Sequence, residues 1–163
     1  MEINKNTAKE LFITHLFDAP VEMVFQAWTD PKQLTQWYAP DGCSISYKKL
    51  DLQEQGSFHS CIHDPVHGDC WVKGKYLEVN APEKLVFSMT LSNEAGDTLA
   101  AADAGKPGDW PMEILTTVSF STIGKQTKLS LHQSVPEASA KENGAFQSWI
   151  KMFDKLAVLL STS

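Results

Sequence analysis

The chain has 163 residues and a formal net charge of −6, with 42% hydrophobic and 21% charged residues. These values are ordinary for one globular domain, which buries roughly two-thirds of its unfolded surface at this size. The negative charge argues against nucleic acid as a partner, because phosphate binding needs a basic face. No apolar run is long enough for membrane insertion, and the N-terminus has no apolar signal segment. Three cysteines in a chain of this size favour reduced thiols and a cytoplasmic location.

The first part of the chain predicts one strand followed by two short helices. Residues 11–17 are rich in β-formers and are expected to form the strand. A first helix opens at Pro20, and apolar residues recur through Trp28 at the spacing of one helical face. A second helix follows, with Asp30 as its N-cap and Pro31 in its first turn.

The middle of the chain is rich in alternating apolar and polar residues and predicts six strands. These strands cover residues 44–52, 57–63, 69–79, 85–91, 114–120 and a last stretch through Leu129 and Leu131. Gly74 interrupts the third of them and suggests a bulge or bend that switches its inward face. Residues 92–111 are rich in glycine, proline and alanine, and a connection of this length is typical of a functional lid or a mobile segment.

A helix is predicted for residues 136–160. Its apolar side chains recur at steps of three and four, on one stripe: Phe146, Trp149, Phe153, Leu156 and Leu160. Pro136 suits the first turn, while Asn143–Gly144 interrupts the pattern and predicts irregular first turns. A helix of this length spans roughly 35 Å, so its partner is expected to be a sheet of long, curved strands.

The order of these elements and several local strings resemble the START-like (SRPBCC) superfamily. Within it, they are most similar to bacterial relatives of the heat-shock-protein ATPase activator, the AHSA-like family. The strings run across nearly the whole chain, at residues 17–20, 24–31, 61–62, 71–72, 74–76, 78–79, 82–87, 110–111, 117–120 and 154–157. The resemblance implies a single domain over residues 1–163 with an α+β helix-grip fold, in which a curved antiparallel sheet wraps a long C-terminal helix.

The resemblance also implies a hydrophobic pocket between the sheet and the C-terminal helix, because START-like folds often hold one there. Its candidate lining consists mostly of large side chains: Trp28, Trp37, Tyr38, Phe58, Cys61, His63, Trp71, Tyr76, Phe87, Met89, Trp110, Trp149 and Phe153. We therefore expect the protein to bind a small apolar ligand. A filled core is the alternative, because close packing is the rule in protein interiors.

Two other functions stay open. One is a chaperone-associated interaction module, in contact with a chaperone or with a second copy of the chain. The eukaryotic co-chaperone of this family has an additional N-terminal domain for which this chain has no room, so we expect no strong stimulation of a heat-shock-protein ATPase. The other is a cofactor-independent cyclase or hydrolase acting on aromatic or polyketide-like substrates. Its acid–base candidates are His59, His63, Glu78, Glu113 and His132, but no catalytic motif joins them, and we favour a role without catalysis.

Thiol and imidazole groups gather on one predicted hairpin. They alternate along its first strand and continue, with a carboxylate, across the turn: His59, Cys61, His63, His67, Asp69 and Cys70. Such groups bind zinc, but neither a C-x-x-C nor an H-E-x-x-H motif is present. The sequence therefore predicts solvated histidines beside free thiols, with no metal and no cofactor.

Overall fold

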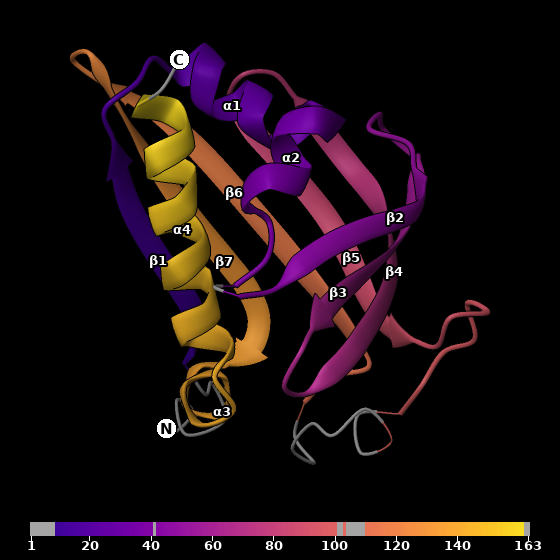
Figure 1. Ribbon diagram of the computed structural model, residues 1–163. Helices are drawn as coiled ribbons and strands as arrows, with labels where there is room; N and C mark the ends of the chain where they lie inside the picture. Colours follow the sequence, from indigo (N-terminus) through magenta and orange to yellow (C-terminus); the bar gives the residue numbers. More distant parts are fainter. Residues whose placement is uncertain (1–8, 41, 101–102, 104–109, 162–163) are drawn as a thin grey trace, which may run out of the picture.

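A computed structural model describes residues 9–40, 42–100, 103 and 110–161. The predicted order of a strand, two helices, six strands and a C-terminal helical segment is confirmed (Figure 1). The strands are β1 (Glu10–Phe17), β2 (Ser44–Leu50), β3 (Ser57–Asp64), β4 (Gly68–Asn80), β5 (Lys84–Ser92), β6 (Glu113–Ile123) and β7 (Gln126–Pro136). The helices are α1 (Val21–Thr29), α2 (Pro31–Trp37), α3 (Glu137–Glu142) and α4 (Ala145–Ser161).

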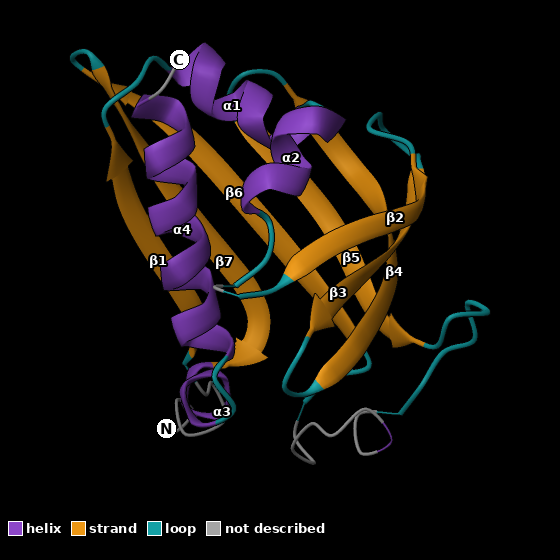
Figure 2. Ribbon diagram, in the orientation of Figure 1, coloured by secondary structure: helices purple, strands orange, loops and turns teal. Residues whose placement is uncertain are grey.

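The strands form one seven-stranded antiparallel sheet in the order β1-β7-β6-β5-β4-β3-β2. The sheet curves, and α1, α2 and α4 lie on one face of it (Figure 2). Helix α4 runs in front of β1 and β7, while α1 and α2 cross one end of the sheet (Figure 2). The α+β helix-grip fold is therefore confirmed. None of the helices in the described part of the chain has the length and apolar character needed to cross a membrane.

Aromatic side chains fill the space between the sheet and the helices. Trp28, Trp37, Phe17 and Phe153 are among the largest fully buried side chains. Trp28 of α1 meets Trp37 of α2 edge-on with ring centroids 4.7 Å apart, and Phe153 of α4 meets Phe17 of β1 edge-on at 6.0 Å. The Trp37 indole N–H donates a hydrogen bond to the Ala27 carbonyl oxygen at 2.9 Å. These contacts fix α1, α2 and α4 against one another and against the sheet.

The C-terminal helix is shorter than the predicted 136–160. It is divided into α3 and the 17-residue α4, with the break at Asn143 and Gly144. Gly144 has a φ of +89°, in the left-handed region that favours glycine. Asn143 Oδ1 accepts a hydrogen bond from the Ala145 backbone N–H at 2.9 Å, which satisfies a donor at the start of α4. The dipeptide therefore ends one helix and starts the next.

The bulge that the sequence predicts at Gly74 lies further along β4. The pairing of β4 with both neighbours continues through Gly74, and the register shift falls between Tyr76 and Glu78. Gly74 serves a packing purpose, because a Cβ atom there would overlap the Ser88 carbonyl oxygen and lie 2.6 Å from Phe58 Cζ. The missing side chain therefore lets the Phe58 ring lie against the β4 backbone.

Candidate functional site

A small cavity, which we call the inner cavity, lies between α1, α2 and the facing strands β2 to β5. Its volume is about 20 Å³, and its lining is mainly apolar: Trp28, Leu34, Tyr38, Tyr47, Phe58, Ser60, Val72, Tyr76, Leu85, Phe87 and Met89. A space of this size holds about one water molecule. The interior is therefore close to a filled core in this conformation.

Four hydroxyl groups interrupt the apolar lining of the inner cavity. Tyr38, Tyr47, Tyr76 and Ser60 supply them, from α2's C-cap and from β2, β4 and β3. Burial raises the pKa of each tyrosine far above its ordinary value, and the neighbouring phenols raise the pKa of Tyr38 and Tyr47 further. All three phenols are therefore neutral near pH 7 and can donate or accept hydrogen bonds inside the cavity.

A chain of buried polar side chains leads from α4 to the cavity wall. The Trp149 indole N–H donates to Gln133 Oε1 at 3.1 Å, and Gln133 Nε2 donates to Thr116 Oγ1 at 3.0 Å. The Thr116 hydroxyl in turn lies 3.9 Å from Met89 Sδ. These contacts satisfy the buried amide of Gln133, which would otherwise destabilise the core. They also connect Trp149 of α4 to Met89 in the cavity lining.

The predicted pocket residues fall into three groups. Six line the inner cavity: Trp28, Tyr38, Phe58, Tyr76, Phe87 and Met89. Four are buried in the same core without lining the cavity: Trp37, Trp110, Trp149 and Phe153. Three project from the other face of the sheet: Cys61, His63 and Trp71. Cys61 and His63 alternate with the inward-facing Ser60, and Trp71 pairs with Cys61.

Sequence reasoning missed five residues of the lining: Leu34, Tyr47, Ser60, Val72 and Leu85. Two of them carried a usable signal. Ser60 stands two residues after Phe58 and Val72 four residues before Tyr76, so each shares a strand face with a predicted pocket residue. Alternation along β3 and β4 identifies these positions more reliably than side-chain size does.

An open cleft, the end cleft, lies beside the inner cavity. It has a volume of about 790 Å³ and is bounded by the β3–β4 hairpin, the end of β5 and the turn between α3 and α4. Ile62, Cys70 and Leu91 line it. On their strands they are the next inward-facing residues after Ser60, Val72 and Met89 of the inner cavity. One layer of side chains therefore separates the inner cavity from the open cleft.

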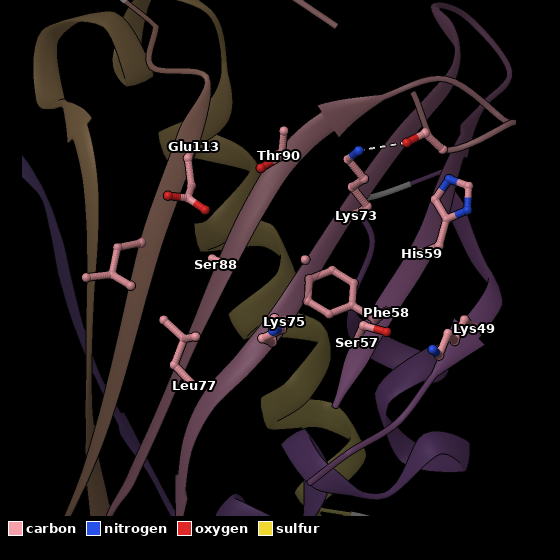
Figure 3. A pocket seen from close by; sticks show the side chains of 13 residues that line it. Lys49, Ser57, Phe58, His59, Lys73, Lys75, Leu77, Ser88, Thr90 and Glu113 are labelled. Atoms are coloured by element: carbon pink, nitrogen blue, oxygen red, sulfur yellow. Dashed lines mark hydrogen bonds between the residues drawn. The ribbon is translucent and has the colours of Figure 1, made fainter. Parts of the chain in front are cut away.

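A second depression, the outer groove, crosses the face of the sheet turned away from the helices (Figure 3). It is open and has a volume of about 710 Å³. Lys49, Lys73 and Lys75 lie along it with Glu113 at its far side (Figure 3). Lys73 Nζ donates to the Gly96 carbonyl oxygen at 2.7 Å, so this cation is already engaged.

The structure brings only some of the acid–base candidates together. His59 Nε2 lies 3.1 Å from the Asn93 carbonyl oxygen, and His132 Nε2 lies 2.8 Å from Glu10 Oε1 at the β1–β7 edge. Glu78 forms an ion pair with a lysine on β5, and Glu113 lines the outer groove. His59 also lines the outer groove, so His59 and Glu113 share one depression (Figure 3), whereas Glu78 and His132 lie elsewhere on the sheet.

Solved structures with the same fold come from several bacteria. A protein of Chromobacterium violaceum is 24% identical, with a TM-score of 0.75 over 92% of this chain and 95% of that chain. A protein of Arthrobacter aurescens is 18% identical, with a TM-score of 0.81 over 96% of this chain and 88% of that chain. The AHSA1 protein of Silicibacter pomeroyi is 19% identical, with a TM-score of 0.72 over 94% of this chain and 99% of that chain. At these identities the likeness shows the fold alone.

The sequence itself identifies the family. No protein of curated function matches it, but the sequence profile described as "Activator of Hsp90 ATPase homolog 1-like protein" matches residues 18–161. The match begins directly after β1 and continues to the last residue of α4. The resemblance seen in the local strings is thereby confirmed, and the chain belongs to the family of Activator of Hsp90 ATPase homolog 1-like proteins.

Proposed function

We propose that the protein binds a small, mainly apolar molecule carrying one hydrogen-bonding group, in the inner cavity and with access from the end cleft. The observation that carries this proposal is the composition of the cavity wall. Aromatic and aliphatic side chains surround it, and four of its lining residues carry hydroxyl groups: Tyr38, Tyr47, Tyr76 and Ser60. A few polar groups within an apolar lining are typical of small-molecule sites.

The volume of the inner cavity sets a condition on this binding. Since about 20 Å³ is free, any ligand larger than a water molecule must displace side chains. Met89 is suited to this, because methionine is unbranched and adapts its shape readily. Displacement of the layer that contains Ile62 and Leu91 would join the inner cavity to the end cleft. Proteins with this fold commonly bind hydrophobic ligands, which supports the same conclusion. No disulfide links the cysteines in the described part of the chain, which suits a reducing compartment such as the cytoplasm.

Titration with an apolar dye, anilinonaphthalene sulfonate, and displacement of the dye by decanoate test the proposal. Val72→Phe enlarges a side chain that lines the inner cavity and should weaken dye binding about tenfold or more, a loss of about 1.4 kcal/mol. The matched control is Leu115→Phe, which makes a comparable enlargement in the outer groove and should leave the affinity unchanged.

Two results would overturn the proposal. One is that the folded wild-type protein binds neither dye nor decanoate at any accessible concentration. The other is that Leu115→Phe weakens binding while Val72→Phe does not, which would place the dye in the outer groove. Thermal unfolding of both variants shows whether each is folded when it is titrated.

The family description supports a second candidate function, contact with a heat-shock protein. We expect the purified chain to give no strong stimulation of the ATPase activity of its cognate chaperone. A coupled ATPase assay measures this, with a chaperone-only reaction as the baseline. Stimulation at a near-stoichiometric ratio of the two proteins would favour the chaperone function over ligand binding.

A further inference from the structure

Three potential metal ligands come together on the face of the sheet turned away from the helices. Cys61 Sγ lies 3.6 Å from His63 Nδ1, and His63 Nδ1 lies 3.0 Å from Asp69 Oδ1. One ligand atom from each residue lies within 4.8 Å of the other two. Cys61 and His63 are on β3, and Asp69 stands directly opposite His63 on β4. Strand pairing therefore builds a cluster that no contiguous motif in the sequence encodes.

These separations suit a zinc ion. Zinc binds sulfur at about 2.3 Å, and imidazole nitrogen and carboxylate oxygen at about 2.0–2.2 Å, in tetrahedral geometry. Those lengths place sulfur about 3.6 Å from nitrogen, and nitrogen about 3.3 Å from oxygen. The observed 3.6 Å and 3.0 Å approach both values. We propose that Cys61, His63 and Asp69 bind one zinc ion on the outer face of the β3–β4 hairpin.

The second nitrogen of His63 has the partner that a metal-binding imidazole needs. Ser46 Oγ on β2 lies 2.8 Å from His63 Nε2. A proton on Nε2, donated to Ser46 Oγ, leaves the Nδ1 lone pair facing Cys61 and Asp69. An outer hydrogen bond of this kind fixes the tautomer and ring orientation of a histidine ligand. Ser46 is therefore a positioning residue for the zinc site.

The Asp69 carboxylate also favours a cation, because it places a negative charge beside the Cys61 sulfur. Zinc binding replaces the proton of the thiol and neutralises the carboxylate. The His63 and Asp69 side chains are 42% and 54% exposed, so the fourth ligand position faces solvent and takes a water molecule.

Neighbouring groups supply internal controls. His67 lies on the same hairpin, but its Nδ1 contacts Asp64 Oδ2 at 2.9 Å and no thiol belongs to that pair. Cys70 pairs with Ile62 on β3, so its side chain projects from the opposite face to Cys61. Substituting His67 or Cys70 therefore removes an imidazole or a thiol from the hairpin without removing a proposed ligand.

Titration of the chelator-treated protein with Co²⁺ tests the site, because a cobalt–thiolate bond absorbs in the near ultraviolet. We expect one equivalent of Co²⁺ to produce this band and an equivalent of Zn²⁺ to abolish it. Cys61→Ser and His63→Ala should lose the band, while Cys70→Ser and His67→Ala should keep it. Ser46→Ala should keep the band but weaken the affinity about 10–100-fold.

Three results would overturn the assignment. The first is a cobalt–thiolate band that survives Cys61→Ser, and the second is a band that disappears with Cys70→Ser. The third is the absence of any band in the wild-type protein. Because Cys61 is fully buried, Cys61→Ser can fail to fold. His63→Ala and Asp69→Asn change exposed side chains and then decide the question: undiminished metal affinity in both would overturn the proposal.

Discussion

Gly74 shows how one residue on β4 determines the packing on both sides of it. Its place is occupied on one side by the Phe58 ring and on the other by the Ser88 carbonyl oxygen of β5. The Phe58 ring also contacts Tyr76 and Phe87, with ring centroids 5.4 and 6.1 Å away. Any side chain at position 74 therefore displaces a residue of the inner cavity wall as well as the Ser88 carbonyl group of β5.

We predict that Gly74→Ala destabilises the protein by about 3 kcal/mol, the upper range for overpacking a well-packed site. Denaturant unfolding followed by circular dichroism measures the change. Gly124→Ala is the control, because Gly124 has a φ of +62° but open space around its Cβ position. Only backbone strain acts there, at roughly 1 kcal/mol. Equal losses in the two variants would show that the contacts around Gly74 are not tight.

The alternation of side chains between the two faces of a strand explains which pocket residues could be predicted from the sequence. Phe58, Tyr76 and Met89 were expected at the pocket, and they line the inner cavity. Cys61 and Trp71 were chosen for residue type alone, although alternation with Ser60 places Cys61 on the other face and pairing places Trp71 beside it. Size and hydrophobicity therefore identify what is buried, whereas alternation is needed to say on which side of the sheet.

At the level of single elements, α4 contributes one continuous apolar stripe to the core. Trp149, Phe153, Leu156 and Leu160 are all buried, as their spacing predicted. The division from α3 was harder to foresee in detail, because the Asn143 side chain adds a hydrogen bond that local propensity does not reveal. A helix of 17 residues still spans about 25 Å, enough to lie along β1 and β7.

We predict that Phe153→Ala costs about 3–5 kcal/mol of stability. Phe153 is fully buried and touches the rings of Phe17, His15 and Trp149, so truncation leaves a void among large neighbours. Val158→Ala on the same helix is the control, because Val158 is 65% exposed and should change little. The denaturant midpoint measures both. A loss for Phe153→Ala well below this range would indicate a pocket wall that collapses or opens.

At the level of the whole molecule, the inner cavity gathers every tyrosine of the chain. The sequence contains three tyrosines, and all of them line the cavity although they come from α2's C-cap, β2 and β4. The fold class followed from the order of the elements and the resemblance. The size of the cavity did not, because it depends on how side chains from six elements fit within fractions of an ångström.

The position of all three tyrosines around the inner cavity predicts a steep loss of stability at high pH. Burial raises the pKa of Tyr38, Tyr47 and Tyr76 in the folded state, while the unfolded chain releases these protons near pH 10. The free energy of unfolding therefore keeps its full contribution from these tyrosines below about pH 10. Above that pH it falls by about 1.4 kcal/mol per pH unit for each tyrosine. Tyr76→Phe should remove one such contribution from the slope.

Urea unfolding at a series of alkaline pH values measures this slope, and the ultraviolet absorbance of tyrosinate reports ionisation directly. We expect tyrosinate to appear together with unfolding in the wild-type protein. Ionisation of any tyrosine in a protein that is still fully folded near pH 10 would contradict the raised pKa of the three tyrosines around the inner cavity.

The pairing of β1 with β7 sets the order in which the molecule can assemble. Ile13 lies opposite Leu131 and Leu11 opposite Gln133, so the first strand is completed by the last one. Closing so long a stretch of chain costs entropy before the contacts form, which makes folding slow. During synthesis on the ribosome, β1 is made before β7 and α4, so its apolar edge stays unpaired until they have been made. In this state β1 can pair with strands of other nascent chains. The yield of folded protein in a cell therefore depends on how long β1 stays unpaired.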